Sequence, residues 1–272
     1  MNVLGAGWPP GIWAALVLSG AIGLSLGLIG GGGSIITVPV LVYVAGLPVR
    51  EAVALSLAVV GTTAAVGAVF QARDANVHTK AALLYGGPGI VGAALGARLT
   101  PLVPAPVLLT LFAVLMVWVG LRMMRPQATA PEYLSARAEC NPTKCVAAGL
   151  VIGIVTGFLG VGGGFLIVPA LLRFTRMPMA QAIGTSLVII AVNSFAGLAA
   201  HVADVQNGMG GLAVAFTVAA IAGLFAGMRL GKRMRPQGLK AVFGALSLAV
   251  AAYLVLMNAG PLWALVTHGV NR

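Results

Sequence analysis

Charged residues are scarce in this sequence, since Asp, Glu, Lys and Arg make up only 8% of its 272 residues. A soluble globular domain carries about 25%, so the composition excludes an ordinary soluble enzyme or binding module. Among the charged residues the acidic ones are the scarcer, with five Asp and Glu against 16 Lys and Arg. None of the five lies in the middle of an apolar segment. A proton relay built from buried carboxylates is therefore not expected.

Cysteine is almost missing as well. The two cysteines, Cys140 and Cys145, stand in the longest polar stretch, PEYLSARAECNPTKC. They are close enough to pair, but two reduced thiols in a loop are the simpler interpretation, and without a nearby histidine they make a poor metal site. We expect neither a metal nor another cofactor.

Apolar residues dominate the rest of the chain. They make up 60% of it, which is typical of an integral membrane protein with one compact membrane domain. The first residues, MNVLGAGWPPGIW, carry no positive charge before the apolar run, so we expect no cleaved signal peptide. The net charge is +11, but the cations lie in short loops between apolar segments, which indicates membrane topology and argues against a nucleic-acid partner.

The sequence repeats itself at an offset of 130 residues. The stretch GLIGGGGSIITVP (27–39) corresponds to GFLGVGGGFLIVP (157–169), and the correspondence continues beyond the prolines. We therefore divide the chain into a first membrane repeat (1–125), a polar linker (126–143) and a second membrane repeat (144–272). Internal repeats with apolar segments interrupted at corresponding points are typical of transporters and mark their binding sites.

Each repeat holds four apolar segments, of which the first is longer than the roughly 20 residues that one crossing needs and carries the glycines near its middle. The segments lie near residues 12–45, 52–72, 81–98 and 105–122, and near residues 145–174, 179–201, 210–229 and 240–258. If both glycine-broken segments enter and leave on one side, 13 Lys and Arg lie on one face of the membrane and 3 on the other. If all eight segments cross, the split is 9 to 7, so the positive-inside rule favours the first arrangement.

The sequence thus predicts an all-α integral membrane protein made of two inverted four-segment repeats, each beginning with a glycine-broken, re-entrant helical hairpin. Glycine in a helix interior costs about 1 kcal/mol relative to alanine, so the run from Gly30 to Gly33 is expected to turn the chain back. The loops near Arg137 and Lys232 are expected on one side of the membrane, and both termini on the other. The spacing of Gly89, Gly92 and Gly96 predicts a helix-packing face.

The two glycine turns are the candidate binding site. Each leaves backbone N–H groups at the start of a helix inside the membrane, and such a helix terminus suits an anion. We expect the N–H groups of 31–35 and 161–165 to hold the ligand, assisted by hydroxyl and amide side chains from the second segments. The candidate substrate-binding residues are Gly31, Gly32, Gly33, Ser34, Thr62, Thr63, Gly162, Gly163, Gly164, Ser186, Asn193 and Ser194. The alternative interpretation is that the glycines serve only close helix packing.

These stretches give the chain a family resemblance. GLIGGGGSIITVP with REAVALSLAVVGTTAAVGA, and GFLGVGGGFLIVP with AQAIGTSLVIIAVNSFAGLAAH, resemble the sulfite exporter TauE/SafE family of membrane transporters over nearly the whole chain. The resemblance implies transport, often outward, of small sulfur-containing or organic anions, such as sulfite or sulfonates, across a bacterial inner membrane. The implied partners are that small anion and the lipid bilayer.

We interpret the chain as a secondary transporter in which one repeat moves against the other and gives alternating access to a site at the membrane midplane. No phosphate-binding lysine follows the glycine runs, so an ion gradient or the anion's own gradient is expected to drive transport. The alternatives are a passive anion channel and, less favoured, a membrane-embedded enzyme. An enzyme would need a convergent catalytic site, whereas His78, His201 and His268 lie far apart at segment ends.

Overall fold

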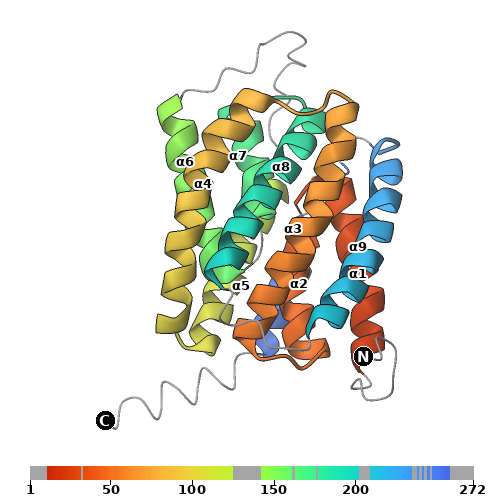
Figure 1. Cartoon of the computed structure of the whole chain (residues 1–272), viewed down its shortest axis with the longest axis vertical. Coiled ribbons are helices and arrows are strands. Elements are labelled where there is room, and N and C mark those ends of the chain that lie inside the picture. Colours follow the sequence, from red (N-terminus) through yellow and green to blue (C-terminus); the bar gives the residue numbers. More distant parts are fainter. Residues whose placement is uncertain are drawn as a thin grey trace.

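The computed structural model describes a bundle of helices that pack side by side (Figure 1). The described residues are 11–31, 33–124, 142–160, 163–175, 177–201, 209–234, 238, 241, 244–245 and 247–257. Within them the elements are α1 (Gly11–Ile29), α2 (Gly33–Pro39), the π-helical turn η1 (Val40–Val44), α3 (Val49–Arg73), α4 (Thr79–Leu99), the 3-10 turn η2 (Thr100–Leu102), α5 (Ala105–Met124), α6 (Pro142–Leu159), α7 (Gly164–Phe174), α8 (Met179–Ala200) and α9 (Met209–Gly231). No strand occurs among these residues, so the all-helical class is confirmed.

Five helices in the described part of the chain are long and apolar enough to cross a membrane: α3, α4, α6, α8 and α9. Shorter apolar helices lie at Trp13–Ile29, Pro106–Leu121 and Ser247–Met257. Large apolar side chains, including Val17, Leu83 and Val114, are exposed on the outside of the bundle. Such a surface fits contact with lipid, because an exposed apolar surface of this extent is unusual for a soluble monomer. The chain is a multi-pass membrane protein.

Both glycine clusters interrupt a helix. After α1 the backbone passes through Gly30, whose φ of 74° favours glycine, and folds back along α1. As a result, a Cβ on Gly33 would lie 2.9 Å from the carbonyl carbon of Ile22. The same happens after α6, where Gly160 has a φ of 68° and a Cβ on Gly163 would lie 3.2 Å from the Cβ of Thr156.

Prolines mark the beginnings of α3 and α8, the long helices that follow α2 with η1 and α7, respectively. Pro48 and Pro178 are the N-caps of α3 and α8, with extended ψ values of 144° and 149°. Proline suits the start of a helix because its missing N–H would have no partner there. Pro39 has the opposite effect inside a helix, where α2 gives way to the wider turn η1, because the missing N–H removes a backbone hydrogen bond.

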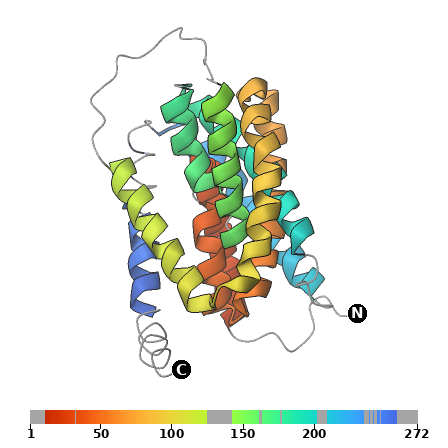
Figure 2. The ribbon, with the colours of Figure 1, turned by 90° about the vertical axis from the view of Figure 1, so that its left-hand side faces the viewer.

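Helices α4 and α6 pack closely through glycines. A Cβ on Gly92 would lie 2.8 Å from the backbone nitrogen of Ile154, and a Cβ on Gly153 would lie 2.8 Å from the Cα of Gly89. Figure 2 shows the two helices side by side along most of their length. The predicted helix-packing face from Gly89 to Gly96 is therefore confirmed.

Helices α1 and α9 form a corresponding pair. A Cβ on Gly27 would lie 2.9 Å from the backbone nitrogen of Met228, and a Cβ on Gly223 would lie 2.8 Å from the carbonyl carbon of Gly20. Each close pair therefore combines a helix from the first half of the chain with a helix from the second. Helix α5 makes a third contact between the halves, since a Cβ on Gly120 would lie 2.9 Å from Cγ of Leu248.

Helices α3 and α8 contact each other between these pairs, and polar contacts join the ends of several helices. The backbone N–H of His78, before α4, donates to Oγ1 of Thr185 in α8 at 2.9 Å. Lys232, after α9, forms an exposed ion pair of 2.8 Å with Asp74 at the end of α3. An exposed pair of this kind contributes little stability, about 0–1 kcal/mol.

Two sequence expectations concern the middle of the chain. The predicted linker, 126–143, lies outside the described residues except for its last two positions, which begin α6. Cys145 is buried in α6 and disulfide-bonded, so the expectation of a reduced thiol is wrong for this residue.

Candidate functional site

The two glycine breaks meet inside the bundle. Gly31, between α1 and α2, and Gly164, the first residue of α7, are both buried. A Cβ on Gly164 would lie only 2.6 Å from the Cα of Gly31, which is closer than any real side chain allows. The backbones of two segments far apart in the sequence therefore touch, and only glycine permits this approach.

Helix α8 supplies the side chains next to this contact. Ile190 packs on Gly164, whose Cβ would lie 3.1 Å from Cγ1 of the isoleucine. One helical turn earlier, Oγ of Ser186 donates to the carbonyl oxygen of Gly30 at 2.6 Å. Residues four apart share one face of a helix, so Ser186, Ile190 and Ser194 form a single stripe that begins at the first glycine turn.

Asn193 is the most unusual polar side chain of this region. It is fully buried, and neither its Oδ1 nor its Nδ2 has a hydrogen-bond partner. The amide lies against α4, where a Cβ on Gly89 would lie 2.7 Å from Nδ2. An unsatisfied buried polar group costs about 1–3 kcal/mol, and buried polar groups are rarely left without a partner. The described residues thus supply no partner for either polar atom of this amide.

Two further hydroxyls, one on α8 and one on α3, lie buried without a hydrogen-bond partner. Ser194 of α8 lies against α3, since a Cβ on Gly61 would lie 3.1 Å from its Cβ. Ser56 of α3 occupies the position that corresponds to Ser186, yet its Oγ has no hydrogen-bond partner. The two halves of the chain therefore differ, because Ser186 is bonded to a glycine turn and Ser56 is not.

The structure places the predicted site residues as follows. Gly31, Gly33, Ser34, Thr63, Gly163, Gly164, Ser186, Asn193 and Ser194 are all buried, whereas Gly32 and Gly162 lie outside the described residues. Oγ of Ser34 donates to the carbonyl oxygen of Gly31 at 2.8 Å, and Oγ1 of Thr63 donates to Val59 at 2.7 Å. Thr62 is exposed on α3 and bonds its own helix at Ala58, so it does not join the others.

Neutral groups make up this region. No Lys, Arg, Asp or Glu is among the buried side chains that the structure describes, and no group of three His, Cys, Asp or Glu in that part of the chain could hold a metal ion. Amide and hydroxyl groups donate hydrogen bonds without a full charge. Such donors can bind an anion and still release it, which transport requires because a site must let its ligand leave.

One polar group near this region was missed by the sequence interpretation. Tyr85 of α4 is fully buried, and its hydroxyl has no hydrogen-bond partner. A signal was available, because the corresponding position of the second half, Phe216, has the same ring without the hydroxyl.

Comparisons with known proteins give one family model and several related membrane proteins. The model of the family described as "Sulfite exporter TauE/SafE" matches residues 15–254. A "Probable membrane transporter protein" of Xylella fastidiosa (strain Temecula1) is 38% identical over 247 residues, which cover 87% of this chain and 92% of that protein. "Probable membrane transporter protein YdhB" of Bacillus subtilis is 26% identical over 175 residues, which cover 62% of this chain and 70% of that protein. No solved structure matches.

Proposed function

Because the chain belongs to the sulfite exporter TauE/SafE family, we propose that this membrane transporter carries small sulfur-containing or organic anions, of the sulfite and sulfonate class, across a bacterial inner membrane. The anion binds where the two glycine breaks meet and is passed across the membrane by alternating access. Recognition uses neutral donors, namely backbone N–H groups of the turns and the unpaired side chains of Asn193 and Ser194. The hydroxyls of Ser34, Thr63 and Ser186, which donate to backbone carbonyls in this structure, rotate toward the anion when it binds.

One observation carries this proposal: the buried amide of Asn193 has no hydrogen-bond partner. Its Nδ2 offers two donors, and it lies on the helix that also packs on Gly164 and bonds Gly30. A sulfite or sulfonate group has three oxygens that accept hydrogen bonds, so one such anion satisfies several of these donors together. Helix termini add partial positive charge, as at other anion sites.

We further propose that the chain consists of two inverted repeats, each opening with a re-entrant hairpin. Support comes from the backbone, which folds back at both glycine breaks, and from charge. In Figure 1 the C-terminal ends of α3 and α9 and the N-terminal ends of α4 and α6 lie at the top of the bundle. The described cations near these ends are Arg73, Lys80, Lys144, Arg229, Lys232 and Arg233. Arg50 and Arg98 lie at the opposite ends of α3 and α4, so the positive-inside rule makes the upper face cytoplasmic.

The bodies that move differ in this proposal from the two sequence repeats. The close pairs α1 with α9 and α4 with α6 each join helices of both repeats through backbone contacts at glycines. Sliding one repeat against the other would break both pairs, because closely packed helices cannot shift without losing those contacts. Each pair therefore moves as one body, and the contact between α3 and α8, together with that between Gly31 and Gly164, changes as access alternates.

Uptake into proteoliposomes tests the proposed function. Purified protein is reconstituted, and uptake of labelled sulfite, methanesulfonate, acetate and chloride is measured with and without unlabelled anion inside the vesicles. We expect sulfite or methanesulfonate uptake that internal anion accelerates, as a carrier requires. Uptake that internal anion leaves unchanged would favour the channel. No uptake of any sulfur-containing anion by folded protein would refute the proposed substrate class.

A further inference from the structure

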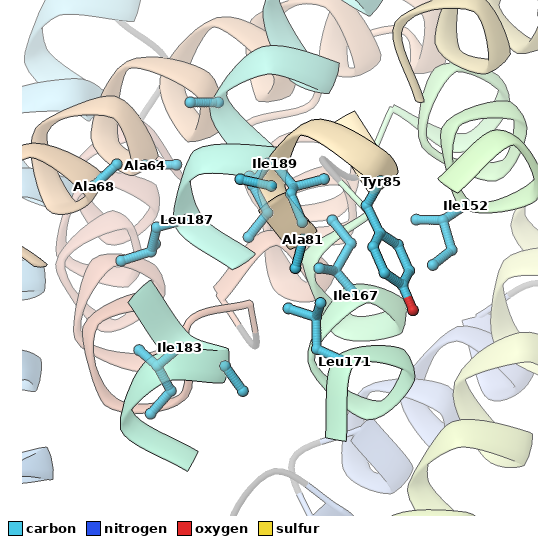
Figure 3. Close-up of a cluster of buried hydrophobic side chains, with 14 of the residues drawn as sticks. Ala64, Ala68, Ala81, Tyr85, Ile152, Ile167, Leu171, Ile183, Leu187 and Ile189 are labelled. Carbon is cyan, nitrogen blue, oxygen red and sulfur yellow. The ribbon is translucent and has the colours of Figure 1, made fainter. Parts of the chain in front are cut away.

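The hydroxyl of Tyr85 lies inside the bundle without a partner. Figure 3 shows the ring extending from α4 between Ile152 of α6 on one side and Ile167 and Leu171 of α7 on the other. The side chain is fully buried, and no described group accepts or donates a hydrogen bond at its oxygen. A tyrosine hydroxyl usually finds a partner when it is buried, so its presence in an apolar cluster calls for an explanation.

The second half of the chain offers an internal comparison. The stretch from Ile90 to Leu99 corresponds to Ile221 to Leu230, and the same register places Phe216 opposite Tyr85. Phe216 is also fully buried. A phenylalanine ring thus fills the corresponding position, which indicates that packing alone does not require the hydroxyl.

The location of Tyr85 connects it with the proposed site. Tyr85 and Gly89 are one turn apart on the face of α4 that packs on α6. A Cβ on Gly149 would lie 2.8 Å from the Cα of Tyr85, and a Cβ on Gly153 would lie 2.8 Å from the Cα of Gly89. Gly89 is also the residue against which the amide of Asn193 lies. The Cα of Tyr85 therefore lies one helical turn from the residue that Asn193 contacts, in the direction of the helix end that carries Lys80.

Helix α7 gives a second connection. It begins at Gly164, in the contact between the two glycine breaks, and continues past Ile167 and Leu171, which flank the tyrosine ring. A group beside this helix can contact a ligand that leaves the helix N-terminus toward the cytoplasmic end. A phenol suits this role because its O–H donates to an oxyanion and carries no charge at neutral pH.

We propose that the hydroxyl of Tyr85 is a further hydrogen-bond donor to the transported oxyanion, placed between the glycine-turn site and the end of the bundle that carries Lys80 and Lys144. This inference rests on the proposed function and adds to it a contact on one side of the site. The corresponding Phe216 cannot donate, so the path is polar on the side of Tyr85 and lacks this donor on the other.

The test compares Tyr85→Phe with the parent protein. Binding of labelled sulfite and melting temperature are measured on purified, monodisperse protein. We expect the affinity for sulfite to fall about tenfold, which corresponds to about 1.4 kcal/mol. The melting temperature should stay the same or rise, since the substitution removes an unpaired buried hydroxyl and keeps the ring. Tyr85→Phe protein that binds sulfite within twofold of the parent, whatever its melting temperature, would overturn the inference.

A control separates this contact from a general effect of buried hydroxyls. Ser247, in the helix 247–257, is fully buried, and its Oγ likewise has no partner. Ser247→Ala should therefore leave sulfite affinity within twofold, and an equal loss in both variants would refute a specific role for Tyr85. If the parent protein itself binds neither sulfite nor methanesulfonate, the proposed function fails, and this inference fails with it. Normal binding by the parent and by Tyr85→Phe refutes the inference alone.

Discussion

Gly31 and Gly164, which come from different halves of the chain, lie backbone to backbone. A Cβ on Gly164 would lie 2.6 Å from the Cα of Gly31, so neither position has room for a side chain. Two breaks that are far apart in the sequence are thus one place in the structure. A ligand bound there would contact both halves. A shift of one break would also displace the other, because their backbones are in contact.

The first prediction concerns the contribution of the close packing of α4 on α6 to stability. Gly92→Ala should lower the melting temperature, because the added Cβ would lie 2.8 Å from the backbone nitrogen of Ile154 and backbone cannot yield as a side chain can. Overpacking of this kind costs about 1–3 kcal/mol. Gly87→Ala on the same helix is the matched control, since no atom lies within 4 Å of its Cβ and alanine favours the helix. Equal melting temperatures for the two variants would show that the glycine contacts do not hold the pair together.

The two corresponding serines should respond differently to the same substitution. Ser186→Ala removes the 2.6 Å hydrogen bond to Gly30, whereas Ser56→Ala removes a hydroxyl that has no partner. A typical hydrogen bond contributes about 1 kcal/mol, so Ser186→Ala should melt roughly 2–4 °C lower than the parent and Ser56→Ala close to it. Thermal unfolding of the purified proteins checks this. A larger loss for Ser56→Ala would mean that the difference between the halves described above is not maintained in solution.

The positions of the helices were largely predictable, because long apolar runs bounded by proline leave few choices. The segments predicted near 52–72 and 179–201 are observed as Val49–Arg73 and Met179–Ala200. The pairing of helices was harder to predict. An internal repeat tells which segments correspond, but it does not tell that α4 of the first half packs on α6 of the second, which depends on long-range contacts between glycines.

The side chains of the site were predictable only in part. Thr62 and Thr63 are neighbours in a run that is apolar almost all round, so no periodicity distinguishes the inner face of the helix from the outer face. Consecutive residues differ in direction by about 100° on a helix, and the structure buries Thr63 and exposes Thr62. Tyr85 was missed because a lone tyrosine in an apolar helix is unremarkable until Phe216 is set beside it.

Membrane topology can be checked with single introduced cysteines. Lys144 and Arg233 are exposed and belong to the proposed cytoplasmic face, while Arg50 is exposed at the opposite end of α3. We expect Lys144→Cys and Arg233→Cys to react with an impermeant maleimide only in inside-out vesicles, and Arg50→Cys only in right-side-out ones. Cys145 is buried and disulfide-bonded, so the labelling is done without reductant. Reaction of positions 144 and 233 from opposite faces would contradict the inverted arrangement.

The most direct test of the account is anion binding by Asn193→Leu. Leucine has nearly the shape of asparagine and removes the unpaired amide, so the fold should be as stable as the parent or more stable. The affinity of the purified protein for sulfite should nevertheless fall at least tenfold, about 1.4 kcal/mol. Thr110→Val, which replaces a hydroxyl on α5 that bonds its own helix at Pro106, should bind sulfite as the parent does. Asn193→Leu protein with parental sulfite affinity would show that the anion does not bind where the two glycine breaks meet.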